Sequence, residues 1–183
     1  MEKKVKILGF AGSLRKTSYN RGLLRAALEV IPSNCSLDIF DLSGIPLFNE
    51  DDEAKPPQQA VRLKEKVRAA DAILIATPEY NYSIPGVLKN ALDWGSRPYG
   101  DSAWDNKPVA IMGASPSMQG TSRAQYHLRQ TFIFLNMHPL NRPELMVASA
   151  QERFDEQGNL TDPKTRKKIA ELLVALAAHA RHR

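Results

Sequence analysis

The sequence predicts a three-layer α/β/α fold, in which helices cover both faces of a doubly wound, five-stranded parallel sheet with strand order 2-1-3-4-5. Two observations predict it. Strand-like and helix-like segments alternate along the chain, an order that implies parallel strands joined by right-handed crossovers. Segment 72–77 (AILIAT) is apolar throughout, as expected for a strand covered on both faces. The length of 183 residues fits one domain spanning residues 1–183.

The first half of the chain contains two further expected strands and two expected helices. Segment 5–10 (VKILGF) is short and apolar, whereas 37–42 (LDIFDL) alternates with the period of a strand. A helix is expected at 19–31, where apolar residues recur at helical spacing, and a charged amphipathic helix at 58–69. The predicted buried face of the first helix consists of Leu23, Leu24, Ala27, Leu28 and Ile31.

The second half continues the alternation. Elements are expected at 86–94 (helix), 108–113 (strand), 121–135 (helix) and 145–148 (strand). A last helix is expected to start at Pro163, because proline fits the first helical position and Asp162 before it is a favourable N-cap. The predicted core face of this helix consists of Ile169, Leu172, Leu173 and Leu176.

Composition and charge exclude several classes of protein. Hydrophobic residues make up 43% of the chain and charged residues 25%, which excludes intrinsic disorder. Cys35 is the single cysteine, so an intrachain disulfide and a cysteine-based metal site are both excluded. The net charge of +5 arises within residues 164–183, which carry six basic side chains and one acidic one. The rest of the chain is balanced, so no nucleic-acid partner is expected.

Membrane and metal partners are not expected either. No apolar run approaches the roughly 20 residues that span a bilayer. The basic start of the chain leads directly into a strand pattern and lacks the features of a signal peptide, so a cytoplasmic location is expected. His127 and His138 are isolated in the sequence and show no metal-ligand spacing, so no metal site is predicted.

Three loops follow predicted strands at the edge where doubly wound sheets bind their ligands. The first, 12–20, lies between a strand and a helix N-terminus, where free backbone N–H groups attract anions. Its donors suit a terminal phosphate, although a capped helix with solvated cations is an alternative. The glycine fingerprints of dinucleotide and Walker A sites are absent. The donors are Ser13, Arg15, Lys16, Thr17, Ser18 and Asn20.

The other two loops are 77–86 and 113–121. The former combines two prolines with Tyr80 and Tyr82, a stiff arrangement that suits a flat heteroaromatic ring. A rigid turn whose tyrosines only pack on a neighbouring surface explains it equally well. The latter is small and polar, and by itself it is best explained as an ordinary turn. Both loops become candidates for ligand binding because they share one sheet edge with the first.

Several short segments in these loops and the following helices carry a resemblance to a known family. They are 12–15 (GSLR) with Ser18 and Asn20, 78–81 (PEYN), 85–86 (PG), 88–94 (LKNALDW) and 123–130 (RAQYHLRQ). With them, nearly the whole chain resembles the NADPH-dependent FMN reductases, which are flavodoxin-like proteins. This family includes bacterial chromate and quinone reductases and azoreductase-like enzymes.

The resemblance implies which residues contact FMN. The phosphate is expected at a group of residues in the first loop, namely Ser13, Leu14, Arg15, Ser18, Tyr19 and Asn20. The isoalloxazine ring is expected at Pro78, Glu79, Tyr80 and Asn81. A third contact falls on Ser115, in a loop that is less rich in glycine than is common in the family.

The resemblance also implies a function. A reductase of this kind passes hydride from NADPH or NADH through FMN to a small-molecule acceptor such as a quinone, a free flavin, an azo compound or chromate. It needs no acid or base side chain, so no catalytic residue is assigned, and it assembles as a homodimer or homotetramer. Residues offered for that interface, or alternatively for the core, are Leu88, Leu92, Trp94, Phe132, Phe134 and Met137.

Three alternatives stay open at this point. A flavodoxin-type electron carrier would bind FMN without oxidising NAD(P)H, but such carriers are acidic on their docking face. An FMN-binding regulatory module would show no turnover with any acceptor. A dehydrogenase would use Asp41, after the second strand, to hold a ribose, although the glycine fingerprint of that class is missing.

Overall fold

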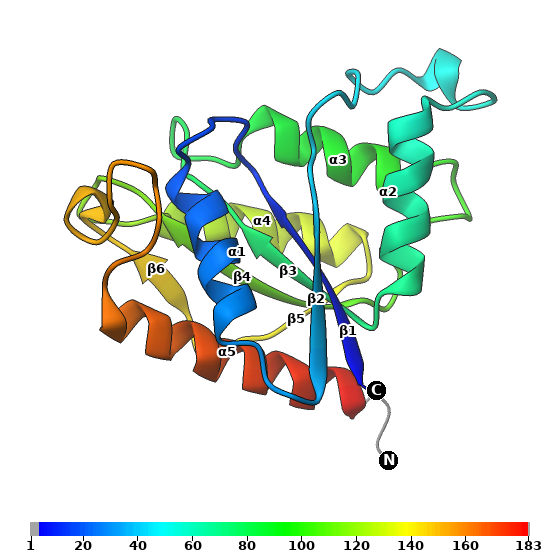
Figure 1. Cartoon of the computed structure of the whole chain (residues 1–183). Helices are drawn as coiled ribbons and strands as arrows, with labels where there is room; N and C mark the ends of the chain where they lie inside the picture. Colours follow the sequence, from blue (N-terminus) through cyan, green and yellow to red (C-terminus); the bar gives the residue numbers. More distant parts are fainter. Residues whose placement is uncertain (1–3, 183) are drawn as a thin grey trace.

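A parallel sheet forms the middle layer of the computed structural model, which describes residues 4–182 (Figure 1). Strand β1 (Val5–Ala11) lies between β2 (Cys35–Phe40) and β3 (Ala72–Ala76), and β4 (Pro108–Ala114) follows β3. All of these pairs are parallel, and the strand order is β2-β1-β3-β4-β5. The doubly wound, flavodoxin-like arrangement predicted from the sequence is therefore confirmed.

The fifth position of the sheet differs from the prediction of one strand at 145–148. Two short strands, β5 (His138–Pro139) and β6 (Leu145–Val147), both pair in parallel with β4. Strand β5 pairs with the start of β4, and β6 pairs with its end. Prolines lie at the end of β5 and within the connection, at Pro143. Because proline has no N–H to donate to a ladder, this segment cannot run as one continuous strand.

Helices cover both faces of the sheet. Their bounds are α1 (Tyr19–Glu29), α2 (Gln58–Ala69), α3 (Gly86–Ser96), α4 (Ser122–Phe134) and α5 (Pro163–Arg181), with short 3₁₀ turns at η1 (Glu50–Asp52) and η2 (Ala150–Glu152). Helices α1 and α5 pack on one face, and α2, α3 and α4 pack on the other (Figure 1). Loops at the C-terminal ends of β1, β3 and β4 thus come together at one edge.

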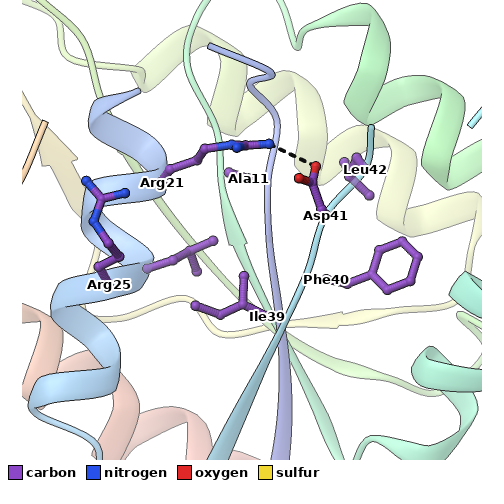
Figure 2. Close-up of a pocket in the computed structure, with 8 residues that line it drawn as sticks. Ala11, Arg21, Arg25, Ile39, Phe40, Asp41 and Leu42 are labelled. Carbon is purple, nitrogen blue, oxygen red and sulfur yellow. Dashed lines mark hydrogen bonds and ion pairs between the residues drawn. The ribbon is translucent and has the colours of Figure 1, made fainter. Parts of the chain in front are cut away.

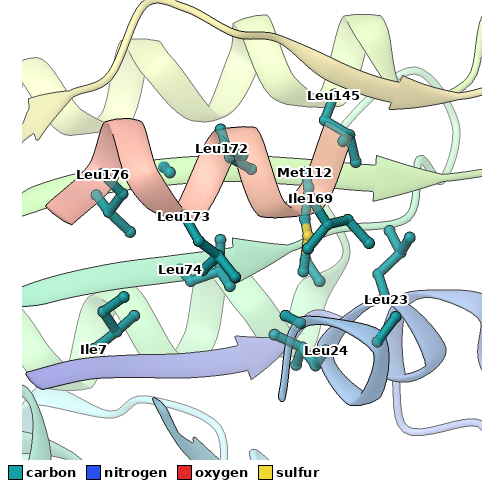
Figure 3. Packing of buried hydrophobic residues seen from close by; sticks show 14 of the residues in the cluster. Ile7, Leu23, Leu24, Leu74, Met112, Leu145, Ile169, Leu172, Leu173 and Leu176 are labelled. Carbon is teal, nitrogen blue, oxygen red and sulfur yellow. The ribbon is translucent and has the colours of Figure 1, made fainter. Parts of the chain in front are cut away.

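Each face of the sheet has its own apolar core. Side chains alternate along β3, so that Leu74 packs against α1 and α5 while Ile73 and Ile75 pack against the helices of the other face. Figure 3 shows the first of these cores. It includes Ile7, Leu74 and Met112 from the sheet, Leu23 and Leu24 from α1, and Ile169, Leu172, Leu173 and Leu176 from α5. The core face predicted for the last helix is therefore confirmed.

Helix α1 ends earlier than predicted. It stops at Glu29, and Ile31 lies beyond it, because the residue before Pro32 is disfavoured in a helical conformation. Leu28, predicted to be buried, is 44% exposed and lies outside the core. Strand β2 begins two residues before the predicted position 37 and ends at Phe40.

The start of α5 agrees with the prediction. Asp162 is its N-cap, and one carboxylate oxygen accepts hydrogen bonds from the backbone N–H and the hydroxyl of Thr165, at 2.9 and 2.5 Å. Arg183, which contributes to the basic C-terminal charge, lies outside the described residues. Within residues 4–182, no helix has the length and apolar character needed to cross a bilayer.

Five of the six residues offered for an oligomer interface or the core belong to the core. Leu88, Leu92, Trp94, Phe132 and Met137 are all buried on the α2–α4 face of the sheet or beside it. Phe134 is the exception and is 77% exposed at the end of α4. Its neighbour Ile133 is also exposed.

Candidate functional site

A pocket opens where the loops after β1, β3 and β4 meet. Its lining residues come from all three loops: Ser13, Arg15, Ser18, Tyr19, Asn20, Pro78, Glu79, Tyr80, Ala114, Ser115 and Pro116. Nine of the eleven residues that the sequence predicted as cofactor contacts are in this group. The other two, Leu14 and Asn81, are exposed and do not line the pocket.

The first loop places two buried hydroxyls at the start of α1. Ser18 is the N-cap of α1, and its Oγ accepts a hydrogen bond from the Arg21 N–H at 3.4 Å. The Oγ of Ser13 accepts one from the Arg15 N–H, also at 3.4 Å. Both serines are at most 4% exposed. Because each hydroxyl accepts a hydrogen bond here, its own hydrogen can be donated to an anion.

Arg15 supplies a cation beside these hydroxyls. Its guanidinium lies over the ring of Tyr19, with the central carbon 4.9 Å from the ring centroid. One guanidinium nitrogen, Nη2, donates to the carbonyl oxygen of Thr17 at 2.8 Å. A cation–π contact and a hydrogen bond thus order this exposed side chain at the mouth of the pocket.

Asn20 joins the first loop to the end of β4. Its Nδ2 donates to the carbonyl oxygen of Ala114 at 3.0 Å, and its Oδ1 accepts from the Ala114 N–H at 2.9 Å. Asn20 is 3% exposed, so both hydrogen bonds are buried. Only one amide hydrogen is left for a ligand. The main contribution of this side chain is therefore to fix the distance between two loops of the pocket.

The second loop contains a tight turn at 80–83. The N–H of Tyr80 donates to the carbonyl of Ser83 at 3.0 Å, and the reverse hydrogen bond measures 2.9 Å. The two central residues, Asn81 and Tyr82, have φ values of 50° and 65°. A left-handed conformation is unusual for tyrosine, and such strain persists only when surrounding contacts support it.

Helix α4 provides that support. The Glu79 carboxylate, which is 7% exposed, accepts hydrogen bonds from the Ala124 N–H at 3.0 Å and from Arg123 at 3.2 Å. Arg123 also lies over the ring of Tyr82, with its guanidinium carbon 4.0 Å from the centroid. The side chain of Glu79 thus caps the start of α4 and neutralises the charge of Arg123. What residue 79 presents to the pocket is therefore mainly its backbone.

A side-chain hydrogen bond supplements this support, because the Oγ of Ser83 lies 2.7 Å from Nδ1 of His127 on α4. The sequence prediction assigned no role to Arg123 or His127. Nothing in the local pattern of α4 could have found them, because their partners lie about 40 residues away and are placed by the fold.

The third loop is tied to β6 and η2. The N–H of Ser115 donates to the carbonyl of Val147 at 3.0 Å, and its carbonyl accepts from the Ala150 N–H at 3.1 Å. Its Oγ accepts from the Ser117 N–H at 3.2 Å. The loop is thus fixed on one side by β6, while the Ser115 hydroxyl stays partly exposed at the pocket.

Comparison with known protein families shows where this arrangement of loops occurs. The family model for NADPH-dependent FMN reductases matches residues 5–152, which include all three loops of the pocket. The chain belongs to this family. An NAD(P)H-dependent FMN reductase of Pseudomonas aeruginosa is 54% identical over 177 residues, covering 96% of this chain and 95% of the relative. A 2-hydroxy-1,4-benzoquinone reductase of a Burkholderia species is 42% identical and covers 98% of both chains.

A solved structure agrees with this membership of the FMN reductase family. The flavoenzyme NAD(P)H:(acceptor) oxidoreductase from Paracoccus denitrificans superposes with a TM-score of 0.88 at 32% sequence identity. The superposition covers 97% of this chain and 98% of that one. The similarity therefore includes most of the segment 153–182, which the family model does not match.

The residues of the pocket fit the mononucleotide that FMN reductases use. A phosphate dianion needs several donors and a nearby cation, and the first loop offers the Ser13 and Ser18 hydroxyls, Arg15 and the start of α1. A group of three or more His, Cys, Asp or Glu side chains that could hold a metal does not occur among residues 4–182. The assignment of individual residues to FMN stays a prediction.

A second hollow lies between α1 and β2 (Figure 2). It shares no lining residue with the three-loop pocket, and it contains Arg21, Arg25 and Asp41 above an apolar floor. Arg21 forms an ion pair with Asp41 at 2.8 Å. Burial alone would raise the pKa of Asp41, but hydrogen bonds from Ser43 and the charge of Arg21 outweigh this effect and lower that pKa. Asp41 is thus engaged by the protein itself, and the dehydrogenase alternative has no support from this position.

Proposed function

We propose that this member of the FMN reductase family is an NAD(P)H-dependent, FMN-containing reductase of small acceptors. The acceptors we propose are quinones, free flavins, azo compounds and chromate. The observation that carries the proposal is the pocket itself: nine predicted contacts, drawn from three separate loops, line one cavity at the sheet edge. The relatives named as FMN and quinone reductases support the same class of reaction.

In this proposal the first loop binds the phosphate of FMN. Ser13 and Ser18 donate their hydroxyl hydrogens, and Arg15 supplies the compensating charge. The cavity has a volume of about 170 Å³, smaller than the roughly 300–1,000 Å³ of sites that enclose a ligand. It would therefore hold the phosphate and the adjoining chain of FMN, and would leave the ring outside, at the open part of the edge.

The second and third loops orient the ring. The stiff backbone of Pro78, Glu79 and Tyr80 faces the cavity from one side, and Ser115 faces it from the other. When bound, FMN supplies the redox chemistry, accepting hydride from NAD(P)H and delivering electrons to the acceptor. The chain needs no acid or base of its own for this. Its contribution is to position the ring and to leave one face open, beside the exposed rings of Tyr80 and Tyr82.

Two further properties belong to this proposal. We propose a homodimer or homotetramer, which the exposed apolar side chains of Ile133 and Phe134 on α4 support. A cytoplasmic location also stays a prediction. Sedimentation analysis of the purified protein tests the first, and fractionation of cells that express the chain tests the second.

Steady-state kinetics test the proposed reaction. Apoprotein supplied with FMN should oxidise NADPH or NADH in the presence of a quinone, and the rates should follow a ping-pong pattern because both substrates use one open site. Riboflavin, which lacks the phosphate, should support less activity than FMN at equal concentration. An FMN-loaded protein that oxidises neither nucleotide with any acceptor would instead be an electron carrier or a regulatory module.

A further inference from the structure

A short hairpin lies directly against the phosphate-binding loop proposed above. It spans residues 153–161, and its strands are joined by the Thr161 N–H, which donates to the Arg153 carbonyl at 2.8 Å, and by a bridge between Phe154 and Leu160. In Figure 1 it is the orange loop beside α1. The family model ends at residue 152, so nothing in that match assigns a role to this segment.

The hairpin and the loop touch backbone to backbone. Gly158 has a φ of +76°, and a Cβ at this position would lie 2.7 Å from the carbonyl oxygen of Thr17. A Cβ on Gly22, in α1, would lie 2.0 Å from the carbonyl oxygen of Gly158. Neither contact leaves room for a methyl group. The tip of the hairpin therefore sets the position of the Thr17 backbone.

Side chains reinforce this contact. Arg25 of α1 donates from Nη2 to the Gly158 carbonyl at 2.8 Å and from Nε to Oδ1 of Asn159 at 3.0 Å. The ring of Phe154 packs on the ring of Tyr19, with centroids 4.9 Å apart. The turn is also closed internally, since the Asn159 N–H donates to the Asp155 carboxylate at 2.7 Å.

Thr17 connects the hairpin to the groups that face the cavity. Its carbonyl oxygen accepts the hydrogen bond that orders Arg15, and it directly precedes Ser18, the N-cap of α1. Tyr19, which Phe154 supports, is the ring beneath the Arg15 guanidinium. A displacement of the hairpin would therefore move the cation and one hydroxyl of the phosphate site together.

We propose that the hairpin 153–161 is a positioning element that holds the first loop in its phosphate-binding geometry. The inference rests on the proposed function, because it requires FMN phosphate at that loop. The hairpin lines no part of the cavity and acts only through Thr17 and Tyr19. Donors that are already ordered bind an anion more tightly, because little conformational freedom is lost on binding.

A pair of glycine variants tests the proposal. Gly158→Ala places a methyl group against Thr17, whereas Gly44→Ala introduces one at a position with the same φ of +76°. At Gly44 the nearest atom is Nε2 of Gln59 at 4.0 Å, so this control carries the same backbone strain without the contact. Affinities of both apoproteins for FMN and for riboflavin are measured by quenching of flavin fluorescence.

We expect Gly158→Ala to bind FMN roughly tenfold or more weakly than Gly44→Ala, with riboflavin affinity equal in the two. Equal FMN affinity in both variants would overturn the proposal. An equal loss for FMN and riboflavin would overturn it as well, because a general loss of structure does not depend on the phosphate. A wild-type protein that binds neither flavin would overturn the proposed function, and this inference with it.

Arg25→Met provides a second variant, in case Gly158→Ala does not fold. It removes two hydrogen bonds to the hairpin without adding bulk near the loop, and Arg62→Met, at an exposed arginine of α2, is its control. Arg25→Met should weaken FMN binding several-fold relative to the control and spare riboflavin. Unchanged selectivity for FMN over riboflavin in Arg25→Met would contradict the positioning role.

Discussion

Replacement of Asn20 by leucine should separate two loops of the pocket. The Asn20 side chain satisfies both the N–H and the carbonyl of Ala114 in the protein interior, and leucine is similar in size but can do neither. A buried backbone group left without a partner costs about 1–3 kcal/mol, so the two together should lower the free energy of unfolding by about 2–6 kcal/mol. A typical domain has only about 5–15 kcal/mol in total, so the variant should fold but melt markedly earlier.

Asn90→Leu is the matched control for this experiment. Asn90 is also a buried amide that bridges backbone groups, accepting from the Phe48 N–H at 2.8 Å and donating to the Pro46 carbonyl at 2.9 Å. It lies on α3 and does not line the pocket. Urea unfolding of the apoproteins should show losses in both variants, whereas FMN affinity should fall, by roughly tenfold or more, only in Asn20→Leu.

Two results would refute this reasoning. A loss of less than about 1 kcal/mol in Asn20→Leu would mean that water or a rearranged backbone satisfies Ala114. Equal FMN affinity in the two leucine variants would mean that the spacing between the first and third loops does not control binding.

Three further predictions concern individual side chains of the pocket and of the helix ends. Arg15→Ala combined with Ser18→Ala should weaken FMN binding about 100-fold or more, because it removes a charge and a hydroxyl from the mouth of the pocket. The far-ultraviolet circular dichroism spectrum should stay that of the wild type. Unchanged affinity would place the phosphate elsewhere. Asp162→Ala should cost about 1–2 kcal/mol of unfolding free energy at neutral pH, the usual effect of losing an N-cap. Hydrogen bonds from Thr165 lower the pKa of Asp162 below its ordinary 3.8, against the effect of burial. The wild type should therefore lose its stability advantage over Asp162→Ala as the pH falls below about 4. If the unfolding free energies of the two proteins instead changed in parallel in acid, Asp162 would not be the N-cap that stabilises α5. Lys107→Met should lower the free energy of unfolding by about 1 kcal/mol. The Nζ of Lys107 donates to the carbonyls of Ala70 and Arg68, at 2.6 and 3.2 Å, at the end of α2. An unchanged urea midpoint would show that water replaces these hydrogen bonds.

The features that the sequence predicted well are those written in local patterns. Apolar runs such as 72–77 and the N-cap at Asp162 depend on neighbours within a few residues, and the structure has them where expected. The three loops could also be placed, because strand order and crossover handedness bring the ends of β1, β3 and β4 to one edge.

The features that sequence reasoning missed depend on contacts between distant segments. Asn20 bonds to a residue 94 positions away, and Arg123 to one 44 positions away, so neither partner can be found without the fold. The sequence therefore predicts Asn20 as a phosphate donor, whereas in the structure its side chain mainly connects two loops of the pocket. The division of the fifth strand position into β5 and β6 was missed for a similar reason, since pairing with β4 defines it.

The central claim is that FMN binds at the three-loop edge with its ring open to a nicotinamide nucleotide. An anaerobic titration of the FMN-loaded protein with NADPH and with NADH, followed at the flavin absorbance maximum, tests it most directly. At least one nucleotide should bleach the flavin stoichiometrically, whereas the Arg15→Ala, Ser18→Ala protein, with its about 100-fold weaker FMN binding, should carry little flavin and show little change. A fully loaded protein whose flavin absorbance is unaffected by either nucleotide would contradict it.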